Sequence, residues 1–268
     1  MKSTAVVYMV AGVSSRFQGK IKQLTKITEN KTLIEYSLDR ALKAEFDKII
    51  FIVGNKTEKA FKEKFKESYK GIPIEYVYQY FDSEKRDKPW GTADAVSLIR
   101  NKDFNLVICN GDDLYGENAF KILANHLKNK ENNATLGYKI KNALPENSPG
   151  NRAVFEIDEN NYVKNIQEVL SIEKTRLDKK NLKPDDLCSM NIWALNPETI
   201  ELLKNYVEEF KQNHKDNRKI ECFLPDALSE IIQKQKIKIK IYPFDEKTIG
   251  ITHPGDELIV RKEIENNK

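Results

Sequence analysis

A loop between residues 10 and 24 combines small residues with cations, which suits the binding of phosphate. Small side chains let backbone N–H groups approach a ligand closely, and fixed cations neutralise its charge. Arg16 and Lys22 are the cations best placed by their spacing. The small residues are Gly12, Ser14, Ser15 and Gly19. Six residues separate Gly12 from Gly19, which excludes a Walker loop. Serine at position 14 does not fit a dinucleotide fingerprint. A solvated lysine-rich loop stays the alternative for this segment taken alone.

A pair of carboxylates, Asp112 and Asp113, follows the apolar run at 106–109. The carboxyl ends of parallel strands are where α/β sheets bind ligands. Mg²⁺ takes one or two carboxylates and leaves its other positions to water and phosphate oxygens. The segment is therefore a candidate metal site. The alternative is an Asn-Gly turn at 110–111 followed by solvated aspartates.

The elements that must position these groups alternate along the first half of the chain. Apolar runs at 5–10, 48–54, 74–79 and 106–109 predict buried strands. Between them, helices are predicted from 33, after a capping box of Thr32 and Glu35, and at 57–67 and 92–100. Continuous apolar strands that alternate with helices are typical of a doubly wound, mostly parallel sheet.

The second half mixes strands and helices less regularly. Strands are predicted at 134–140, 152–157, 162–167, 190–195 and 237–242, with a hairpin turn at 158–161. Helices are predicted at 197–210, at 224–233 and from His253 onward, and the charged segment 173–184 is expected to be a mobile excursion. We expect one domain, 1–268, with a nucleotide-binding half at about 1–130 and a sugar-phosphate-binding half at about 131–268.

Composition excludes several classes of protein. The net charge is +4 and is spread along the chain without a basic tail, so nucleic-acid binding is not indicated, whereas an anionic small substrate is compatible. Cys109, Cys188 and Cys222 follow no metal or disulfide spacing. No run approaches the roughly 20 apolar residues of a membrane span. We expect a cytoplasmic protein without a membrane partner; monomer and homo-oligomer both stay open.

Five segments in order resemble the sugar-1-phosphate nucleotidylyltransferases. They are residues 10–16 with Lys22 and Gln23 beyond them, 90–95, 110–116, Glu168 after Val163 and Ile166, and 189–193. The resemblance covers essentially the whole chain. It implies a three-layer α/β/α, Rossmann-like nucleotidyltransferase fold (GT-A-like) with a mostly parallel, mixed central sheet.

The resemblance also implies roles for individual residues. Arg16 and Lys22 would neutralise the β- and γ-phosphates, and Asp112 would hold Mg²⁺ between the α-phosphate and the incoming sugar phosphate. The nucleotide would be bound by Ala11, Gly12, Ser14, Ser15, Gln79, Gly91, Thr92 and Gly111, with Gln79 or Thr92 reading the base edge. The sugar phosphate would meet Asp113, Glu168, Asn191 and Lys247.

The chain departs from the family near its end. Many members carry a late metal-binding Asp, but the matching stretch 247–253 has no carboxylate. Asp256 is a substitute candidate, although an Asp in a first helical turn also suits the helix dipole. His253 is expected to mark a helix start and not a catalytic base. Because the sequence stops soon after this helix, no room is expected for the acyltransferase module of bifunctional relatives.

The function expected from these features is an Mg²⁺-dependent transfer. An NTP, with UTP favoured by family frequency, and a sugar 1-phosphate would give an NDP-sugar and pyrophosphate. Three alternatives stay open: a CTP- or GTP-dependent enzyme acting on another phosphorylated acceptor, a metal-dependent glycosyltransferase of similar fold, and a non-catalytic nucleotide-sugar-binding regulator.

Overall fold

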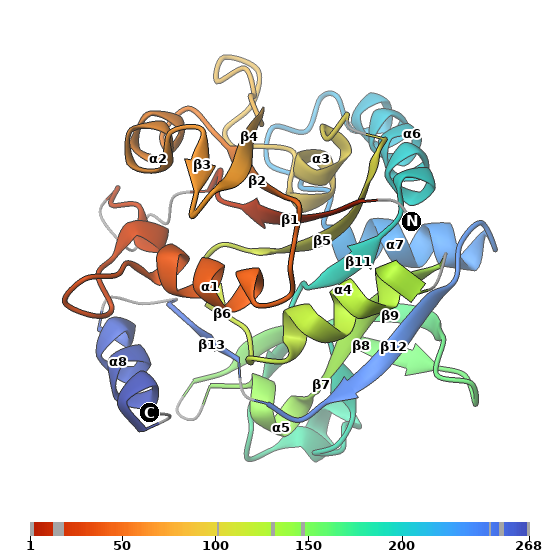
Figure 1. Ribbon diagram of the computed structural model, residues 1–268. Coiled ribbons are helices and arrows are strands. Elements are labelled where there is room, and N and C mark those ends of the chain that lie inside the picture. Colours follow the sequence, from red (N-terminus) through yellow and green to blue (C-terminus); the bar gives the residue numbers. More distant parts are fainter. Residues whose placement is uncertain are drawn as a thin grey trace.

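A long mixed sheet runs through both halves of the chain (Figure 1). The computed structural model describes residues 3–12, 19–100, 102–129, 132–145, 148–246, 248–251 and 255–266. Within this part, eleven strands pair in the order β3-β4-β2-β1-β5-β11-β7-β10-β8-β9, with β12 beside β7. They are β1 (Ser3–Met9), β2 (Lys48–Val53), β3 (Ser68–Tyr69), β4 (Ile72–Tyr78), β5 (Phe104–Asn110), β7 (Asn133–Lys139), β8 (Gly150–Ile157), β9 (Val163–Ile172), β10 (Leu187–Cys188), β11 (Trp193–Leu195) and β12 (Ile239–Phe244).

The strands of the first half pair in parallel, as their continuous apolar runs indicate. β4, β2, β1 and β5 form three parallel ladders, so their carboxyl ends meet at one edge. β11 then pairs antiparallel with β5 and β7, and β12 pairs parallel with β7. A separate two-stranded sheet joins β6 (Asp113–Leu114) to β13 (Ile249–Gly250). The predicted mixed, mostly parallel sheet is confirmed.

Helices cover both faces of the sheet and create two cores. On one face, α1 (Leu33–Leu42), α2 (Glu58–Phe65), α4 (Ala119–Asn129) and α5 (Ile140–Ala143) pack on side chains such as Tyr8 and Phe51. On the other, α3 (Thr92–Ser97), α6 (Pro197–Asn213) and α7 (Leu224–Gln233) pack on alternate residues of the same strands, such as Val7 and Ile52. Side chains of neighbouring residues leave a strand on opposite faces, so each strand serves both cores. The three-layer prediction is confirmed.

A third, small core attaches the last helix, α8 (Asp256–Asn266). Val260 and Ile264 of α8 pack with Leu114 of β6 and with Ile27 and Ile251. Through this cluster, the end of the chain is tied to the segment that follows β5. In Figure 1, α8 and β13 lie below α1.

Several local predictions are confirmed and several boundaries differ. Thr32 and Glu35 form the predicted capping box, with the Thr32 N–H 2.9 Å from Glu35 Oε2. The strand predicted at 190–195 is shorter because Asn191 has a φ of +56°, which interrupts extended backbone. The segment 173–184, expected to be mobile, contains a 3₁₀ turn at Leu177–Lys180 whose Leu177 is buried. The start of a last helix at His253 lies outside the described residues.

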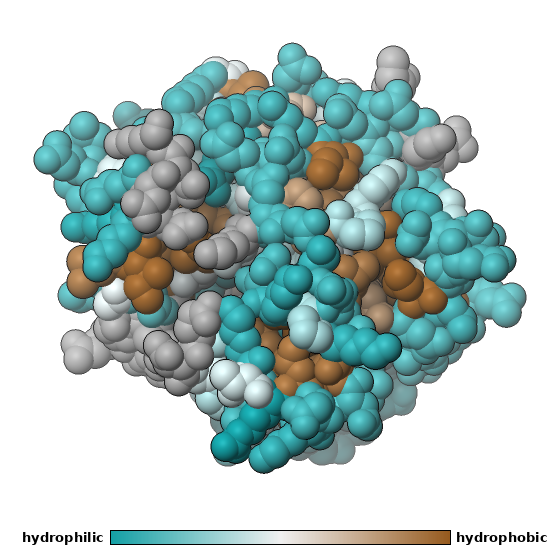
Figure 2. Space-filling view, turned by 90° about the horizontal axis from the view of Figure 1, so that it is seen from below, coloured by the Kyte–Doolittle hydropathy of each residue, from teal (hydrophilic) through white to brown (hydrophobic). Residues whose placement is uncertain are grey.

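The face in Figure 2 is mainly hydrophilic, with hydrophobic areas separated by polar side chains. Among the described helices, none combines the length and the apolar character that a membrane crossing requires. Cys109, Cys188 and Cys222 are free and buried.

Candidate active site

The predicted site residues gather at the carboxyl edge of the parallel strands. Ala11 and Gly12 follow β1, Gln79 follows β4, and Asn110 ends β5 directly before Gly111 and Asp112. Because these strands are parallel and adjacent, the segments that leave them share one edge. Sequence positions as distant as 12 and 112 therefore meet in one place.

The loop after β1 is described only in part. Ser14, Ser15 and Arg16 lie outside the described residues, so their predicted roles are not tested. An added Cβ at Gly12 would meet none of the described residues within 4 Å. Gln23, in the short 3₁₀ helix Lys22–Leu24, directs its Nε2 to the Gly12 carbonyl at 3.5 Å.

Lys22 and Asp112 are in direct contact. The Lys22 Nζ forms an ion pair with Asp112 Oδ2, and the two side chains are 16% and 26% exposed. The first comes from the segment after β1 and the second from the segment after β5. The structure thus brings together a cation and a carboxylate that the sequence predicts to be catalytic.

Close packing requires glycine at position 111. An added Cβ there would lie 2.3 Å from Val10 Cγ1, and the Gly111 N–H already donates to the Met9 carbonyl at 3.2 Å. The backbone between β5 and Asp112 consequently lies against the end of β1. This approach positions Asp112 beside Lys22.

Asp113 lies in β6 opposite Gly250 of β13. A Cβ at residue 250 would lie 2.3 Å from Asp113 Oδ1, so only glycine leaves room for this carboxylate. Burial and the neighbouring charge of Asp112 raise the pKa of Asp113 to about 6, although a hydrogen bond from Asn110 and the charges of Arg152 and Lys22 act in the opposite direction. Burial is the larger cause of this rise, and the repulsion between the adjacent carboxylates adds to it.

A chain of amide hydrogen bonds connects Asp113 to Asn191. The Asn110 Nδ2 donates to Asp113 Oδ2 at 2.9 Å, and the Asn191 Nδ2 donates to Asn110 Oδ1 at 2.8 Å. The Trp193 Nε1 in turn donates to Asn191 Oδ1 at 2.9 Å. The left-handed backbone at Asn191 turns its side chain toward this network. Asn191 is thus positioned beside the carboxylates from the second half of the chain.

The segment at Gly91 and Thr92 lies against residues 222–224. The Ala93 N–H donates to the Cys222 carbonyl at 3.0 Å, and the Cys222 N–H donates to the Trp90 carbonyl at 2.7 Å. Thr92 Oγ1 accepts from the Leu224 N–H at 2.9 Å, which leaves the Thr92 hydroxyl proton for another acceptor. Gly91 has a φ of +101° and a ψ of −174°, a conformation that glycine alone adopts readily.

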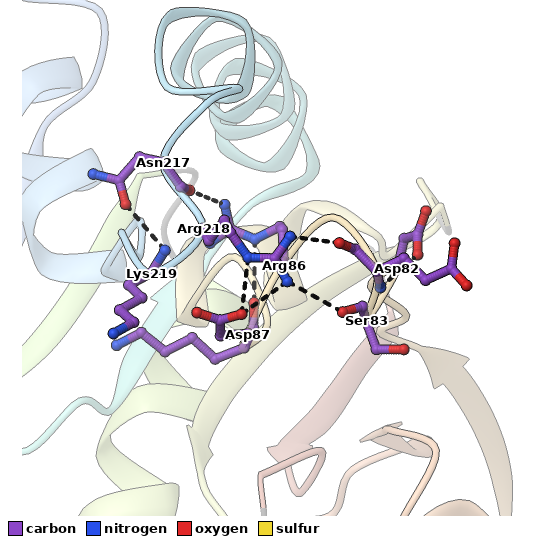
Figure 3. Close-up of polar contacts among 9 residues, drawn as sticks. Asp82, Ser83, Arg86, Asp87, Asn217, Arg218 and Lys219 are labelled. Atoms are coloured by element: carbon purple, nitrogen blue, oxygen red, sulfur yellow. Dashed lines mark hydrogen bonds and ion pairs between the residues drawn. The ribbon is translucent and has the colours of Figure 1, made fainter.

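Two arginines fix the loop that leads to Gly91 (Figure 3). Arg86 is 4% exposed, and its guanidinium lies 3.4 Å from the centroid of the Trp90 ring. It donates hydrogen bonds to the backbone carbonyls of Lys88, Asn217 and Ile220. Arg218 donates to Asp87 Oδ1 at 2.9 Å and also to the carbonyls of Ser83 and Glu84. We call these contacts the arginine clasp. It attaches residues 82–90 to the segment between α6 and α7.

On the acceptor side, Glu168 is exposed on β9, opposite Ala153 of β8. Partial desolvation of the carboxylate and the charge of Asp226 raise its pKa, and the charge of Arg152 lowers it. Lys247 lies outside the described residues. Arg152 is a cation that the sequence prediction missed: its charge lowers the pKa of both Asp113 and Glu168, while its guanidinium donates to the backbone carbonyls of Ala143 and Asn151. Its only sequence signal is an arginine after a Pro- and Gly-containing loop.

The residues that could hold a metal are Asp112 and Asp113. Among the described residues, no group of three or more His, Cys, Asp and Glu side chains could hold one, so Asp256 does not join these two in such a cluster. Asp256 begins α8 and has a polar partner of its own. Two adjacent carboxylates, one with a raised pKa, still form a donor set that suits a divalent cation completed by phosphate oxygens.

Comparison with known families matches residues 12–242 to the profile described as Nucleotidyl transferase. The chain belongs to this family. The match confirms the resemblance seen in the five segments. Among curated proteins it is 26% identical over 239 residues to the bifunctional protein GlmU of Staphylococcus carnosus, covering 87% of this chain and 46% of that protein. It is 25% identical over 255 residues to GlmU of Lactobacillus johnsonii, covering 92% of this chain and 48% of that protein. The chain thus spans about half the length of these relatives.

Solved structures share the fold. A UDP-glucose pyrophosphorylase complexed with UDP-glucose superposes with a TM-score of 0.69 at 18% identity, covering 99% of this chain and 100% of the other. A UTP-bound UGPase from Acinetobacter baumannii gives 0.66 at 14% identity, covering 99% and 94%. Likeness at this level of identity concerns the three-layer architecture.

Proposed function

We propose that this nucleotidyltransferase joins an NTP, UTP by preference, to a sugar 1-phosphate and releases pyrophosphate. The observation that carries the proposal is the contact between Lys22 and Asp112 at the carboxyl edge of β1 and β5. A triphosphate needs a fixed cation for its charge, and a metal needs a carboxylate; both groups stand together at the strand ends where α/β sheets bind ligands.

The order of the groups along the sheet edge supports the roles that we assign. Gln79, Gly91 and Thr92 lie by β4 and α3 and would receive the base. Ala11 and Gly12 follow β1, with Ser14, Ser15 and Arg16 in the same loop, and would meet the phosphates. Gly111 brings Asp112 to the α-phosphate, and the second half contributes Asn191 and Glu168 toward the sugar phosphate, with Lys247 as a further cation for it. We propose one domain with a nucleotide half and an acceptor half, located in the cytoplasm.

The chemistry required of the protein is positioning and charge neutralisation. An oxygen of the sugar phosphate attacks the α-phosphorus, a new P–O bond forms, and the bond to the departing pyrophosphate breaks. Lys22, with Arg16, holds the charge of the leaving group. The phosphate monoester is already ionised near neutral pH, so no general base is needed.

Asp112 and Asp113 would hold Mg²⁺, which neutralises phosphate charge when it is bound. In the structure, the positive charge of Lys22 neutralises the charge of Asp112. When an NTP is bound, its phosphates would compete with Asp112 for the Lys22 ammonium. Asp256 stays a separate candidate for a metal contact, to be tested by substitution.

UTP is proposed because UDP-glucose and UTP are the ligands of two solved structures that share the fold. The test is pyrophosphate release with Mg²⁺, each of UTP, CTP, GTP and dTTP, and a panel of sugar 1-phosphates and other phosphorylated alcohols. We expect release with UTP and at least one sugar 1-phosphate. Release only with another NTP or acceptor would replace the substrate assignment, and no release with any pair would refute the proposed transfer.

A further inference from the structure

The orientation of the Gln79 side-chain amide is fixed by two hydrogen bonds. Gln79 is 6% exposed and follows β4. Its Nε2 donates to the Gly91 carbonyl at 2.9 Å and to Asp94 Oδ2 at 2.7 Å. An amide nitrogen carries two hydrogens, so both are used. The Gln79 Oε1 accepts no hydrogen bond from the residues that the structure describes, and it is the one polar atom of this side chain left for a ligand.

The chemistry of the partners decides this orientation. A backbone carbonyl and a carboxylate can only accept hydrogen bonds. Turning the amide by 180° would place Gln79 Oε1 against two oxygens and lose both hydrogen bonds. The nitrogen must therefore point toward Gly91 and Asp94, and the oxygen must point away from them.

Asp94 holds this arrangement because its own charge is balanced. It lies in α3, is 2% exposed, and forms an ion pair with Lys211 of α6, whose side chain is 33% exposed. A buried carboxylate without a cation is costly, whereas a paired one is a strong hydrogen-bond acceptor. Lys211 thus keeps Asp94 in the acceptor role that Gln79 requires.

We propose that Asp94 and Lys211 are positioning residues that determine base specificity through Gln79, an inference that rests on the proposed function. They force Gln79 to present a carbonyl, so the nucleobase must present an N–H donor opposite it. Uracil and thymine carry such a donor at N3, whereas N3 of cytosine is an acceptor. A lone pair of cytosine N3 opposite Gln79 Oε1 is unfavourable, which selects UTP or dTTP over CTP.

The first test uses the unmodified enzyme and two UTP forms. N3-methyl-UTP lacks the donor but keeps the triphosphate and the rest of the base. We expect its KM, and its Kd by calorimetry, to be at least about tenfold higher than those of UTP, since one hydrogen bond and a close contact are lost. We expect kcat with the bound nucleotide to change much less. Equal affinity for the two compounds, or tighter binding of CTP than of UTP, would overturn the proposal. The Kd comparison does not require turnover, so it is separable from failure of the proposed transfer.

The second test changes the positioning residues. In Asp94→Asn, the side-chain oxygen of the new asparagine would stay in contact with the Lys211 ammonium, so its nitrogen would face Gln79. This nitrogen is a hydrogen-bond donor, and it favours the orientation of the Gln79 amide that is rotated by 180°. We expect the ratio of kcat/KM for UTP to that for CTP to fall about tenfold, an effect that a purely structural role would not produce. In Lys211→Met we expect a smaller fall in the same direction. Lys204→Met is the matched control, since Lys204 lies in the same helix and, among the described residues, pairs only with exposed Glu201.

Thermal melting shows whether each variant is folded. If Asp94→Asn does not fold, the Lys211→Met ratio and the N3-methyl-UTP comparison decide the question. A folded Asp94→Asn enzyme with the ratio of the unmodified enzyme would overturn the proposal, as would an equal fall in Lys204→Met.

Discussion

Substitution of Gly91 by alanine tests the geometry of the base-binding segment. The backbone at Gly91 has a φ of +101° and a ψ of −174°, a region that costs other residues about 1–3 kcal/mol. The new Cβ would also lie 2.4 Å from the Cys222 carbonyl oxygen and 2.9 Å from Cys222 C and N. All three are backbone atoms, so no side-chain rotation relieves the contact.

The expected magnitude follows from what must move. If residue 222 retreats, the hydrogen bonds from Cys222 N–H to Trp90 and from Ala93 N–H to Cys222 weaken or break, at about 1 kcal/mol each. Together with the backbone term, we expect Gly91→Ala to lower the free energy of unfolding by roughly 3–5 kcal/mol. For a chain of this size, that corresponds to a fall in melting temperature of roughly 10 °C.

The assay combines denaturant unfolding with the KM for UTP. Because the Gly91 carbonyl accepts a hydrogen bond from Gln79, displacement of Gly91 should raise this KM more than the KM for the sugar phosphate. Gly71→Ala is the matched control: its φ is +85°, but an added Cβ meets nothing within 4 Å, so only backbone strain of about 1–2 kcal/mol is expected. A Gly91→Ala enzyme no less stable than Gly71→Ala, with an unchanged KM for UTP, would refute the reasoning.

Four further predictions address the carboxylates, the cation and the fold. Asp112→Asn is expected to lower kcat at least about 100-fold with little change in melting temperature, because the charge that faces the metal and Lys22 is lost; near-normal turnover would show that Asp112 is not the metal ligand. Asp256→Asn should lower kcat far less, and an equal loss in the two variants would make Asp256 a metal contact. Lys22→Ala should raise the KM for the NTP by about tenfold and that for the sugar phosphate less, since a charged hydrogen bond to phosphate is removed; equal increases would contradict a triphosphate role. Asp39 is held by Lys31, Lys70 and Tyr69, and these hydrogen bonds lower its pKa although burial alone would raise it. The contribution of ionised Asp39 to folding stability is therefore present above about pH 4 and lost as pH falls through the lowered pKa. Asp39→Asn should lower the free energy of unfolding at pH 7 and make it depend less on pH in the acid range. Urea unfolding from about pH 2 to 7 measures both effects.

Local patterns were sufficient to predict the parallel strands and the carboxylates at their ends. The apolar run before Asn110 identifies β5, and the rule for parallel strand ends brings Asp112 toward the β1 loop, where Lys22 is found. The capping box at Thr32 is equally local. These features depend on neighbours within a few residues, which the sequence displays directly.

Contacts between residues far apart in the sequence could not be predicted from such local patterns. Arg86 donates to a carbonyl 131 positions later, and Asp94 finds its cation on α6. No periodicity or spacing connects such partners, because each is selected by the packing of α3, α6 and α7 on one face of the sheet. The shortness of β11 could not be predicted for the same reason. Asn191 has a left-handed backbone, which ends the extended segment, and its side chain hydrogen-bonds to Asn110 and Trp193.

The arginine clasp has a consequence for the order in which the protein is completed. A ribosome that has synthesised all of β1 to β5 has made every strand of the parallel edge, but not residues 217–224, against which the base-binding segment rests. Gly91 and Gln79 can reach their final geometry only after this late segment emerges and docks. The base-binding segment is therefore completed only after residues 217–224 have been made, later than every strand of the parallel edge.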